Sequence, residues 1–384
     1  MENNCSIIPN FTLSRARKGY NLYMESEQEI ISFIESGHLR VGPVSFQIAT
    51  PRRARRDSGP DLILQAQWRE NELRFATEIN RYASDKCVME AANNAQYYAD
   101  SMSMLPLVVV PWLSEEQLLS LEERKISGVD LSGNGVLIAP DLSVFRTGGH
   151  NKFRASRPSK RVYNGTSSLV ARVFLLRAEF AAVSEIQDEI IARGGNITLS
   201  TVSKALKQLE DDVIISKTKG GIRLLQADKL LSRLRANYQA PKTTTIKRCK
   251  VVADGDIAAL IAKAAKKADS RLVLSGSSSV DNYATMGRDA MDSYFCTSIP
   301  FDELERFGGK IDMNSRFPNV EFQVTNEEYV YFDARRDKTE RLIASPIQTY
   351  LELSTSDKRG QETAQQIEAN ILAGLPTVER GTSS

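Results

Sequence analysis

The first 150 residues alternate short apolar stretches with amphipathic ones, which is the pattern of strands and helices that follow one another. Apolar residues at alternate positions or in unbroken runs predict strands over 44–49, 61–67, 72–79 and 105–112. Apolar residues at helical spacing predict helices over 26–36, 84–102 and 114–124. Because strands alternating with helices build a mixed or parallel sheet with helical cover, we expect an α/β domain over residues 1–150.

A different pattern begins near residue 167. Apolar residues at helical spacing predict helices over 167–180, 183–195, 199–212 and 227–238. The segment 213–225 is apolar, then basic with two glycines, then apolar again, which predicts a β-hairpin. Gly194 and Gly195 are placed to end the second helix, and Ser200 to cap the third. Helices followed by a basic hairpin predict a winged helix-turn-helix over residues 167–240.

The rest of the chain has no such regular pattern. Residues 245–375 mix short helices and strands, which predicts an α+β domain, and Asp256 is placed to cap a helix that begins at residue 257. The basic segment 151–166 predicts a linker, and residues 376–384 predict a disordered tail. The expected fold is therefore multidomain, α/β plus α+β, with a central winged helix-turn-helix.

Length and composition are those of a multidomain globular protein. The chain has 384 residues, 41% of them hydrophobic and 26% charged, which is enough apolar material for two or three cores. It has no apolar run long enough to span a membrane, and its first residues lack the pattern of a secretory signal. Four separated cysteines and two histidines argue against a disulfide framework, a zinc site and a histidine-based triad. We therefore expect a reduced, cytoplasmic protein.

The net charge is only +2, but the basic residues are clustered. Residues 196–240 carry eight basic and four acidic residues, a net charge of +4. Two other clusters could neutralise phosphates: Arg52, Arg53, Arg55 and Arg56 near the start of the chain, and Lys152, Arg154, Arg157, Lys160 and Arg161 in the linker segment. The alternative for each of these two clusters is a solvated loop without a partner.

The helix predicted over 199–212 has the surface of a DNA-reading helix. Leu199, Val202, Leu206 and Leu209 fall on one face, which leaves the polar side chains on the others. In a winged helix-turn-helix this helix enters the major groove, where hydroxyls and lysines suit base edges and phosphates. The residues expected at DNA are Ser200, Thr201, Ser203, Lys204, Lys207 and Gln208 on the helix, and Lys217, Lys219 and Arg223 on the hairpin. The alternative is a helical unit used for protein contact or dimerisation.

An acidic pair in the first domain has the pattern of a nuclease site. Asp61 and Glu78 fall on two strands joined by a polar turn, and two such carboxylates are ligands for a magnesium ion that holds a scissile phosphate and an attacking water. Position 80, where such a site needs a lysine, holds Asn80, which supplies no cation for the developing charge. Further candidates are Glu27 or Glu29 as a third ligand, Lys86 as a substitute cation, and Gln96 and Tyr97 as polar helix residues.

The pairs Pro60-Asp61 and Glu78-Ile79 resemble the motifs of the PD-(D/E)XK nuclease superfamily, and Asn80 is a departure from them. The resemblance implies a nuclease-like domain and, for an active enzyme, Mg²⁺ held by Asp61 and Glu78 with Lys86 in a catalytic role. Because the usual lysine is absent, we expect a catalytically silent fold. The alternative is a magnesium-dependent DNA endonuclease that the winged helix targets to DNA.

Residues 165–375 resemble the AbiEi-like antitoxins of type IV toxin–antitoxin systems, in which a winged helix precedes a characteristic C-terminal domain. The segment "RLVLSGSSSVDNYA" resembles that domain's strand, turn and helix start. The residues that match its closing segment are Pro346, Gln348, Tyr350, Leu351, Arg359, Gly360 and Ala364. The resemblance implies a transcriptional regulator that binds double-stranded DNA without a cofactor, often at inverted repeats and as a homodimer. It also implies a cognate toxin as a partner.

Overall fold

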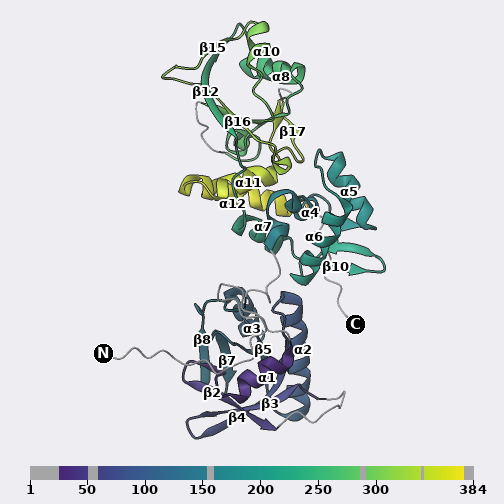
Figure 1. The fold of residues 1–384 in the computed structure, drawn as a ribbon, viewed down its shortest axis with the longest axis vertical. Helices are drawn as coiled ribbons and strands as arrows, with labels where there is room; N and C mark the ends of the chain where they lie inside the picture. The colour runs from purple at the N-terminus through teal and green to yellow at the C-terminus, as the bar shows by residue number, and fades with distance from the viewer. Residues whose placement is uncertain (1–25, 51–58, 154–159, 286–290, 339–340, 376–384) are drawn as a thin grey trace, which may run out of the picture. The chain divides into compact units, whose positions relative to one another are not determined.

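The computed structural model describes residues 26–50, 59–153, 160–285, 291–338 and 341–375, and the chain divides into two compact units, residues 1–158 and 159–384 (Figure 1). The boundary lies inside the segment predicted to be a linker. Both units combine helices with β-sheets, so the predicted multidomain mixture of α and β structure is confirmed. Among the described residues, no helix is both long and apolar enough to cross a membrane.

The first unit is built on one eight-stranded sheet whose strands lie in chain order. The strands are β1 (Arg40–Val41), β2 (Val44–Thr50), β3 (Leu62–Trp68), β4 (Asn71–Ile79), β5 (Leu105–Val110), β6 (Ser127–Asp130), β7 (Gly135–Ala139) and β8 (Leu142–Arg146). β4, β5 and β6 are parallel neighbours, and the other neighbours are antiparallel. The parallel strand β5 is buried on both faces, which is why its sequence is an unbroken apolar run.

Helices cover both faces of this sheet. Leu107 and Val109 of β5 pack with the apolar residues of α1 (Glu27–Glu35) on one face. Val108 and Val110 pack with α2 (Asp85–Met102) and α3 (Glu115–Glu123) on the other. This division follows from the alternation of side chains along a strand. α3 begins with a capping box, in which Ser114 and Gln117 satisfy each other's backbone N–H groups.

The second unit begins with four helices around a small sheet. The helices are α4 (Ser168–Phe174), α5 (Val183–Ala192), α6 (Leu199–Asp211) and α7 (Ala227–Ala236), and the strands are β9 (Glu179–Phe180), β10 (Ile215–Thr218) and β11 (Gly221–Leu224). The predicted hairpin is confirmed, with Thr218 opposite Gly221 at its tip. The helix predicted over 167–180 is wrong in its second half, because Glu179 and Phe180 pair with β11 as a third strand.

A seven-stranded mixed sheet follows, in the order β15-β12-β16-β14-β13-β18-β17. Its strands are β12 (Thr245–Val252), β13 (Leu272–Leu274), β14 (Asp292–Cys296), β15 (Lys310–Asp312), β16 (Val320–Val324), β17 (Arg335–Arg336) and β18 (Leu342–Ile343). The helices are α8 (Ile257–Lys267), the short α9 (Gly276–Ser279), α10 (Phe301–Arg306), α11 (Pro346–Ser354) and α12 (Lys358–Ala373). Asp256 caps α8 as predicted, its carboxylate accepting from the N–H of Ala258.

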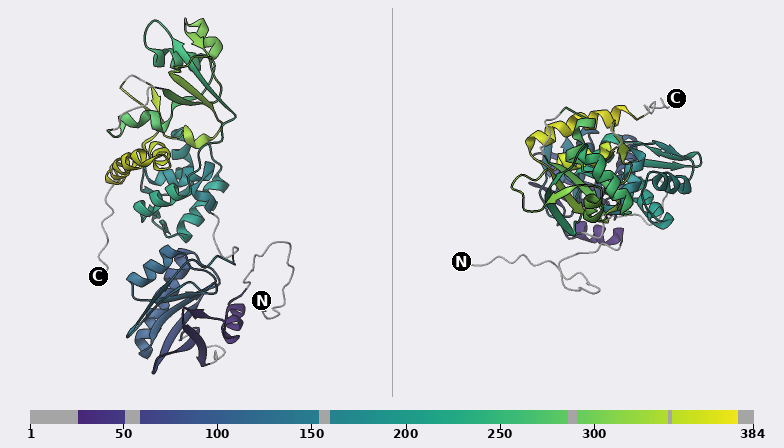
Figure 2. Two further views of the ribbon diagram at one scale, coloured as in Figure 1. Left: turned by 90° about the vertical axis from the view of Figure 1, so that its left-hand side faces the viewer. Right: turned by 90° about the horizontal axis from the view of Figure 1, so that it is seen from above.

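The two parts of the second unit share one hydrophobic core. Leu274 and Tyr294 face α8 and α10, whereas Val273 and Phe295 face the opposite way. On that side lie α11 and α12, which in Figure 2 run between the sheet and the α4–α7 group. A single buried cluster therefore runs from Val162, through α4 to α7, to α11 and α12.

Candidate nucleic-acid interface

α6 separates its apolar and polar residues as a groove-reading helix must. Val202, Ala205, Leu206 and Leu209 are buried against α4, α5 and β10. The polar side chains that the other faces leave exposed to solvent are those of Ser200, Ser203, Lys204 and Lys207. Four of the six DNA-contact residues predicted on this helix therefore lie where a nucleic acid could reach them.

The other two predicted residues of α6 have partners within the protein. The hydroxyls of Thr201 and Thr198 lie 2.9 Å apart, and the Nε2 of Gln208 donates to Asp212 at 3.2 Å. The prediction that Ser200 caps α6 is wrong, because the Thr198 hydroxyl accepts from the N–H of Thr201 instead. α6 begins at Leu199, which lies in its first turn. Leu199 is 46% exposed, whereas Val202, Leu206 and Leu209, predicted on the same face, are buried.

The β10–β11 hairpin adds two exposed cations to the same part of the unit. Lys217 and Lys219 are exposed at its tip, where the hydroxyl of Thr218 accepts from the N–H of Gly220 at 3.2 Å. Arg223 lies further back on β11, and its Nε forms an ion pair of 2.6 Å with Glu179 of β9. A phosphate contact by Arg223 would therefore compete with an existing ion pair. Lys217 is on β10, opposite Ile222, and Lys219 lies beyond the last strand pair.

The acidic residues of α6 and of the position that follows it, Glu210, Asp211 and Asp212, lie at the far end of the helix. Asp212, which follows the helix, accepts hydrogen bonds from the hydroxyl of Tyr163 at 2.6 Å and from Gln208. Its carbonyl accepts from the Nζ of Lys229 at 3.2 Å. Within α6, negative charge is thus concentrated near the C-terminus, away from Ser200 and Ser203 in its first turns.

The turn between α5 and α6 requires its glycines. α5 ends at Ala192, three residues before the predicted bound, and the two glycines end it as predicted: the N–H groups of Gly194 and Gly195 donate to carbonyls of its last turn. Gly194 has a φ of +78°, which favours glycine. A Cβ on Gly195 would lie 2.7 Å from the Cγ2 of Ile190 and 3.1 Å from its carbonyl oxygen. The close approach of the turn to the last turn of α5 therefore depends on a residue without a side chain.

The second unit has a helical part, residues 160–240, and a C-terminal part, residues 245–375. A buried polar network joins α4 of the helical part to the C-terminal part. Arg172, only 2% exposed, donates to the Oε1 of Gln348 at 2.8 Å and to the carbonyl of Tyr329 at 3.1 Å. Gln348 in turn donates to Glu352 at 2.8 Å, and Glu352 accepts from the N–H of Gly276 at 2.9 Å. Burial lowers the pKa of Arg172 to about 10 and raises the pKa of Glu352 to about 7.

The remaining predicted phosphate contacts lie largely outside the described residues. Those outside are Arg52, Arg53, Arg55, Arg56, Arg154 and Arg157. Lys152 is exposed, next to the buried Phe153. Lys160 and Arg161 belong to the short 3-10 helix Lys160–Tyr163, and their side chains are not among the described atoms.

The acidic pair of the first unit forms a close cross-strand contact. Asp61 immediately precedes β3, and Leu62 lies opposite Thr77, so Asp61 is next to Glu78 of β4. The carboxylate of Asp61 accepts from the N–H of Ile79 at 2.9 Å. Burial, followed by the negative charge of Asp61, raises the pKa of Glu78 to about 7, although hydrogen bonds from the Asn94 side chain and the Asp61 backbone lower it in part.

The helix residues predicted around this pair are only partly correct. Gln96 donates to Asp100 on its own helix at 2.7 Å, and Tyr97 is 70% exposed. The residue of α2 that reaches Glu78 is Asn94, which sequence reasoning missed. Glu78 lies on the face of β4 that α2 covers. The helical spacing of the α2 residues that face this strand could therefore have indicated Asn94 in place of Gln96. Lys86 lies in the first turn of α2.

The residues at the acidic pair do not fit a nuclease magnesium centre. Asn80 uses its Oδ1 to accept from the N–H of Tyr82 at 2.9 Å, as a local turn residue. In the described part of the chain, no group of three or more His, Cys, Asp or Glu residues could hold a metal ion. The described residues of this pair therefore support no metal-dependent step.

No protein-family model, curated protein or solved structure matches this chain. The resemblances to the nuclease superfamily and to the antitoxins remain predictions.

Proposed function

We propose that residues 167–240 form a winged helix-turn-helix that binds double-stranded DNA. α6 is the reading helix, and the β10–β11 hairpin is the wing. The observation that carries the proposal is the exposure of Ser203, Lys204 and Lys207 on the face of α6 opposite its buried residues. Short hydroxyls can bond base edges, while lysines next to them contact phosphates or guanine.

The arrangement of charge supports DNA over a protein partner. The exposed cations of α6 and of the hairpin tip belong to the same group of helices and strands, and the acidic residues of α6 are confined to its last turn. Exposed lysines beside short hydroxyls suit a phosphate backbone better than a protein interface, whose centre is depleted in lysine.

The wider role we propose is transcriptional regulation. As in the antitoxins that residues 165–375 resemble, the protein would bind an inverted repeat as a homodimer and have a cognate toxin as a protein partner. DNA binding needs no cofactor. The first unit is a nuclease-like domain without catalytic activity, because the acidic pair lacks both a lysine at Asn80 and a complete set of metal ligands in the described residues.

The test is binding of the full-length protein to a labelled duplex from the region upstream of its own gene. Lys204→Ala combined with Lys207→Ala should weaken binding at least about tenfold and flatten its salt dependence, since each lost phosphate contact removes about 0.9 from the slope of log K against log salt. The matched control is Lys266→Ala combined with Lys267→Ala, which removes two exposed lysines from α8 and changes the net charge equally. Equal affinity and slope in the wild type and the α6 variant would refute the assignment of α6 to the groove.

A further inference from the structure

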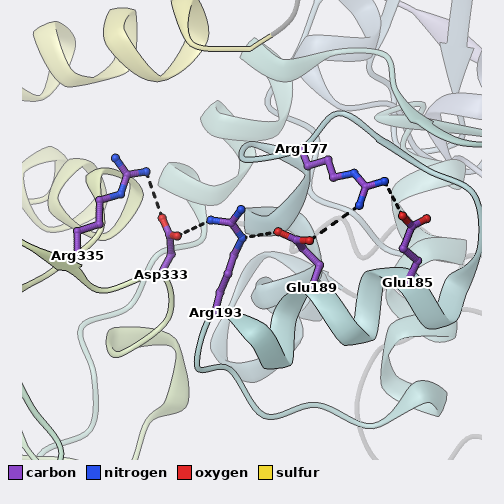
Figure 3. Close-up of polar contacts among 6 residues, drawn as sticks. All are labelled: Arg177, Glu185, Glu189, Arg193, Asp333 and Arg335. Atoms are coloured by element: carbon purple, nitrogen blue, oxygen red, sulfur yellow. Dashed lines mark hydrogen bonds and ion pairs between the residues drawn. The ribbon is translucent and has the colours of Figure 1, made fainter.

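The turn that leads into α6 is bonded to residues far along the chain. The N–H of Asp333 donates to the carbonyl of Arg193 at 2.9 Å, and the NH1 of Arg193 forms an ion pair of 2.7 Å with the carboxylate of Asp333. Figure 3 shows the Asp333 carboxylate between Arg193 and Arg335, the second arginine at 3.3 Å. The Asp333 side chain is 9% exposed and that of Arg193 is 32% exposed, so the ion pair is shielded from water on its carboxylate side.

A second arginine holds the next residue of the turn. The NH2 of Arg271 donates to the carbonyl of Gly194 at 2.9 Å, while its NH1 forms an ion pair of 2.6 Å with Glu328. The same guanidinium lies over the ring of Tyr331, 4.3 Å from its centroid. Arg271 is therefore held from two sides by residues 328–331 while it bonds the turn.

These contacts satisfy the backbone groups that determine where the turn lies. The last carbonyls of a helix have no partner within it, so whatever bonds them fixes the direction in which the chain leaves. Here the carbonyls of Arg193 and Gly194 are bonded by Asp333 and Arg271. The chain reaches the first turn of α6 only a few residues later.

The rest of the ion-pair ladder in Figure 3 stays within the helical part. Arg193 also bonds Glu189 at 2.7 Å, and Arg177 bonds both Glu189 and Glu185. Since Arg177 and Glu185 precede or begin α5, their contact orients neither the turn nor any residue of the C-terminal part. Of the five ion pairs in the ladder, only Arg193–Asp333 crosses to the C-terminal part, and Arg177–Glu185 is a pair of the same chemistry that does not.

We propose that Arg271 and residues 328–335 form a positioning clamp for the DNA-reading helix, with Arg193, Arg271 and Asp333 as its positioning residues. The clamp holds the α5–α6 turn at one angle to the C-terminal part, so that DNA affinity depends on side chains that touch no DNA. This inference rests on the proposed function of α6. It gives the C-terminal part a task in DNA recognition that is separate from any contact with a protein partner.

The test uses the full-length protein and three variants. Asp333→Asn removes the charge but keeps the shape, and asparagine tolerates the left-handed backbone of Asp333, whose φ is +53°. Arg271→Gln releases the Gly194 carbonyl independently, which keeps the test valid should Asp333→Asn not fold. Glu185→Gln breaks the ion pair with Arg177 and is the matched control. The readouts are hydrogen exchange of amides 194–202 without DNA, affinity for the upstream duplex, and unfolding temperature.

The clamp predicts that Asp333→Asn and Arg271→Gln each speed exchange of these amides and weaken DNA binding about three- to tenfold, as expected for loss of a charged hydrogen bond. Both readouts should stay at the wild-type level in Glu185→Gln. A fall in unfolding temperature without faster exchange of the turn would indicate a merely structural contact and overturn the inference. Faster exchange in a protein whose wild type binds no DNA would instead refute the proposed function and leave the clamp standing.

Discussion

Replacing Glu78 by glutamine should make the first unit more stable at alkaline pH and leave it nearly unchanged at acidic pH. In the folded protein the pKa of Glu78 is raised from 4.5 to about 7. As pH rises from 4.5 to 7 the unfolded chain therefore releases this proton first, and the folded state loses stability. A pKa shift of this size would correspond to a loss of about 3 kcal/mol in unfolding free energy. Because Glu78 is partly exposed, solvent screening reduces this loss to about 1–2 kcal/mol.

Glutamine keeps the size of the side chain and one acceptor for the N–H of Asp61 but carries no charge. The gain of about 1–2 kcal/mol in unfolding free energy should therefore appear at pH 8 and vanish near pH 4.5. Urea unfolding followed by tryptophan fluorescence measures it in the full-length protein, because Trp68 and Trp112, the two tryptophans of the chain, both lie in the first unit. Glu72→Gln, at an exposed position of the same strand, is the control. A gain that is equal at the two pH values would refute the account of Glu78.

Two further outcomes are expected. Gly195→Ala should destabilise the second unit by about 1–3 kcal/mol, measured by thermal unfolding, because its Cβ would meet Ile190 at 2.7 Å; Gly220→Ala, where the nearest atom is 3.6 Å away, should cost less. Supercoiled plasmid incubated with the protein and Mg²⁺ or Mn²⁺ should remain intact, because Asn80 supplies no cation to the acidic pair, and cleavage that Asp61→Ala abolishes would contradict this.

The sequence predicted correctly those elements whose structure depends on interactions between residues close together in the chain. The amphipathic spacing of α6, the glycine end of α5 and the two-glycine hairpin are all encoded within a few residues of one another. The choice of capping residue was wrong because three hydroxyl residues, Thr198, Ser200 and Thr201, stand near the start of α6. Which of them caps the helix depends on where the chain leaves the preceding turn, and distant residues also bond that turn.

The elements that the sequence did not predict depend on partners far along the chain. β9 has two residues, too few for any periodicity, and exists because β11 offers it a free edge. Residue type does not distinguish Asn94 from Gln96, because both are amides on α2, and only the direction in which each side chain leaves the helix places Asn94 at Glu78. The contact of Arg193 with Asp333 spans 140 positions, and neither residue stands in a pattern that marks it.

Arg172 shows most directly why the helical part and the C-terminal part behave as one unit. It interrupts an apolar helix, and burial of its charge without a directly bonded carboxylate is unfavourable, as its lowered pKa reflects. The cost is offset only where Gln348 and the carbonyl of Tyr329 are in place, and both belong to the C-terminal part. Apolar packing alone would allow α4 to slide against α11, whereas a buried guanidinium with fixed acceptors admits one arrangement. The Arg172 network and the contacts at the α5–α6 turn therefore join α4–α7 to the C-terminal part at two separate points. The position of α6 thus depends on its neighbouring helices and also on the C-terminal part.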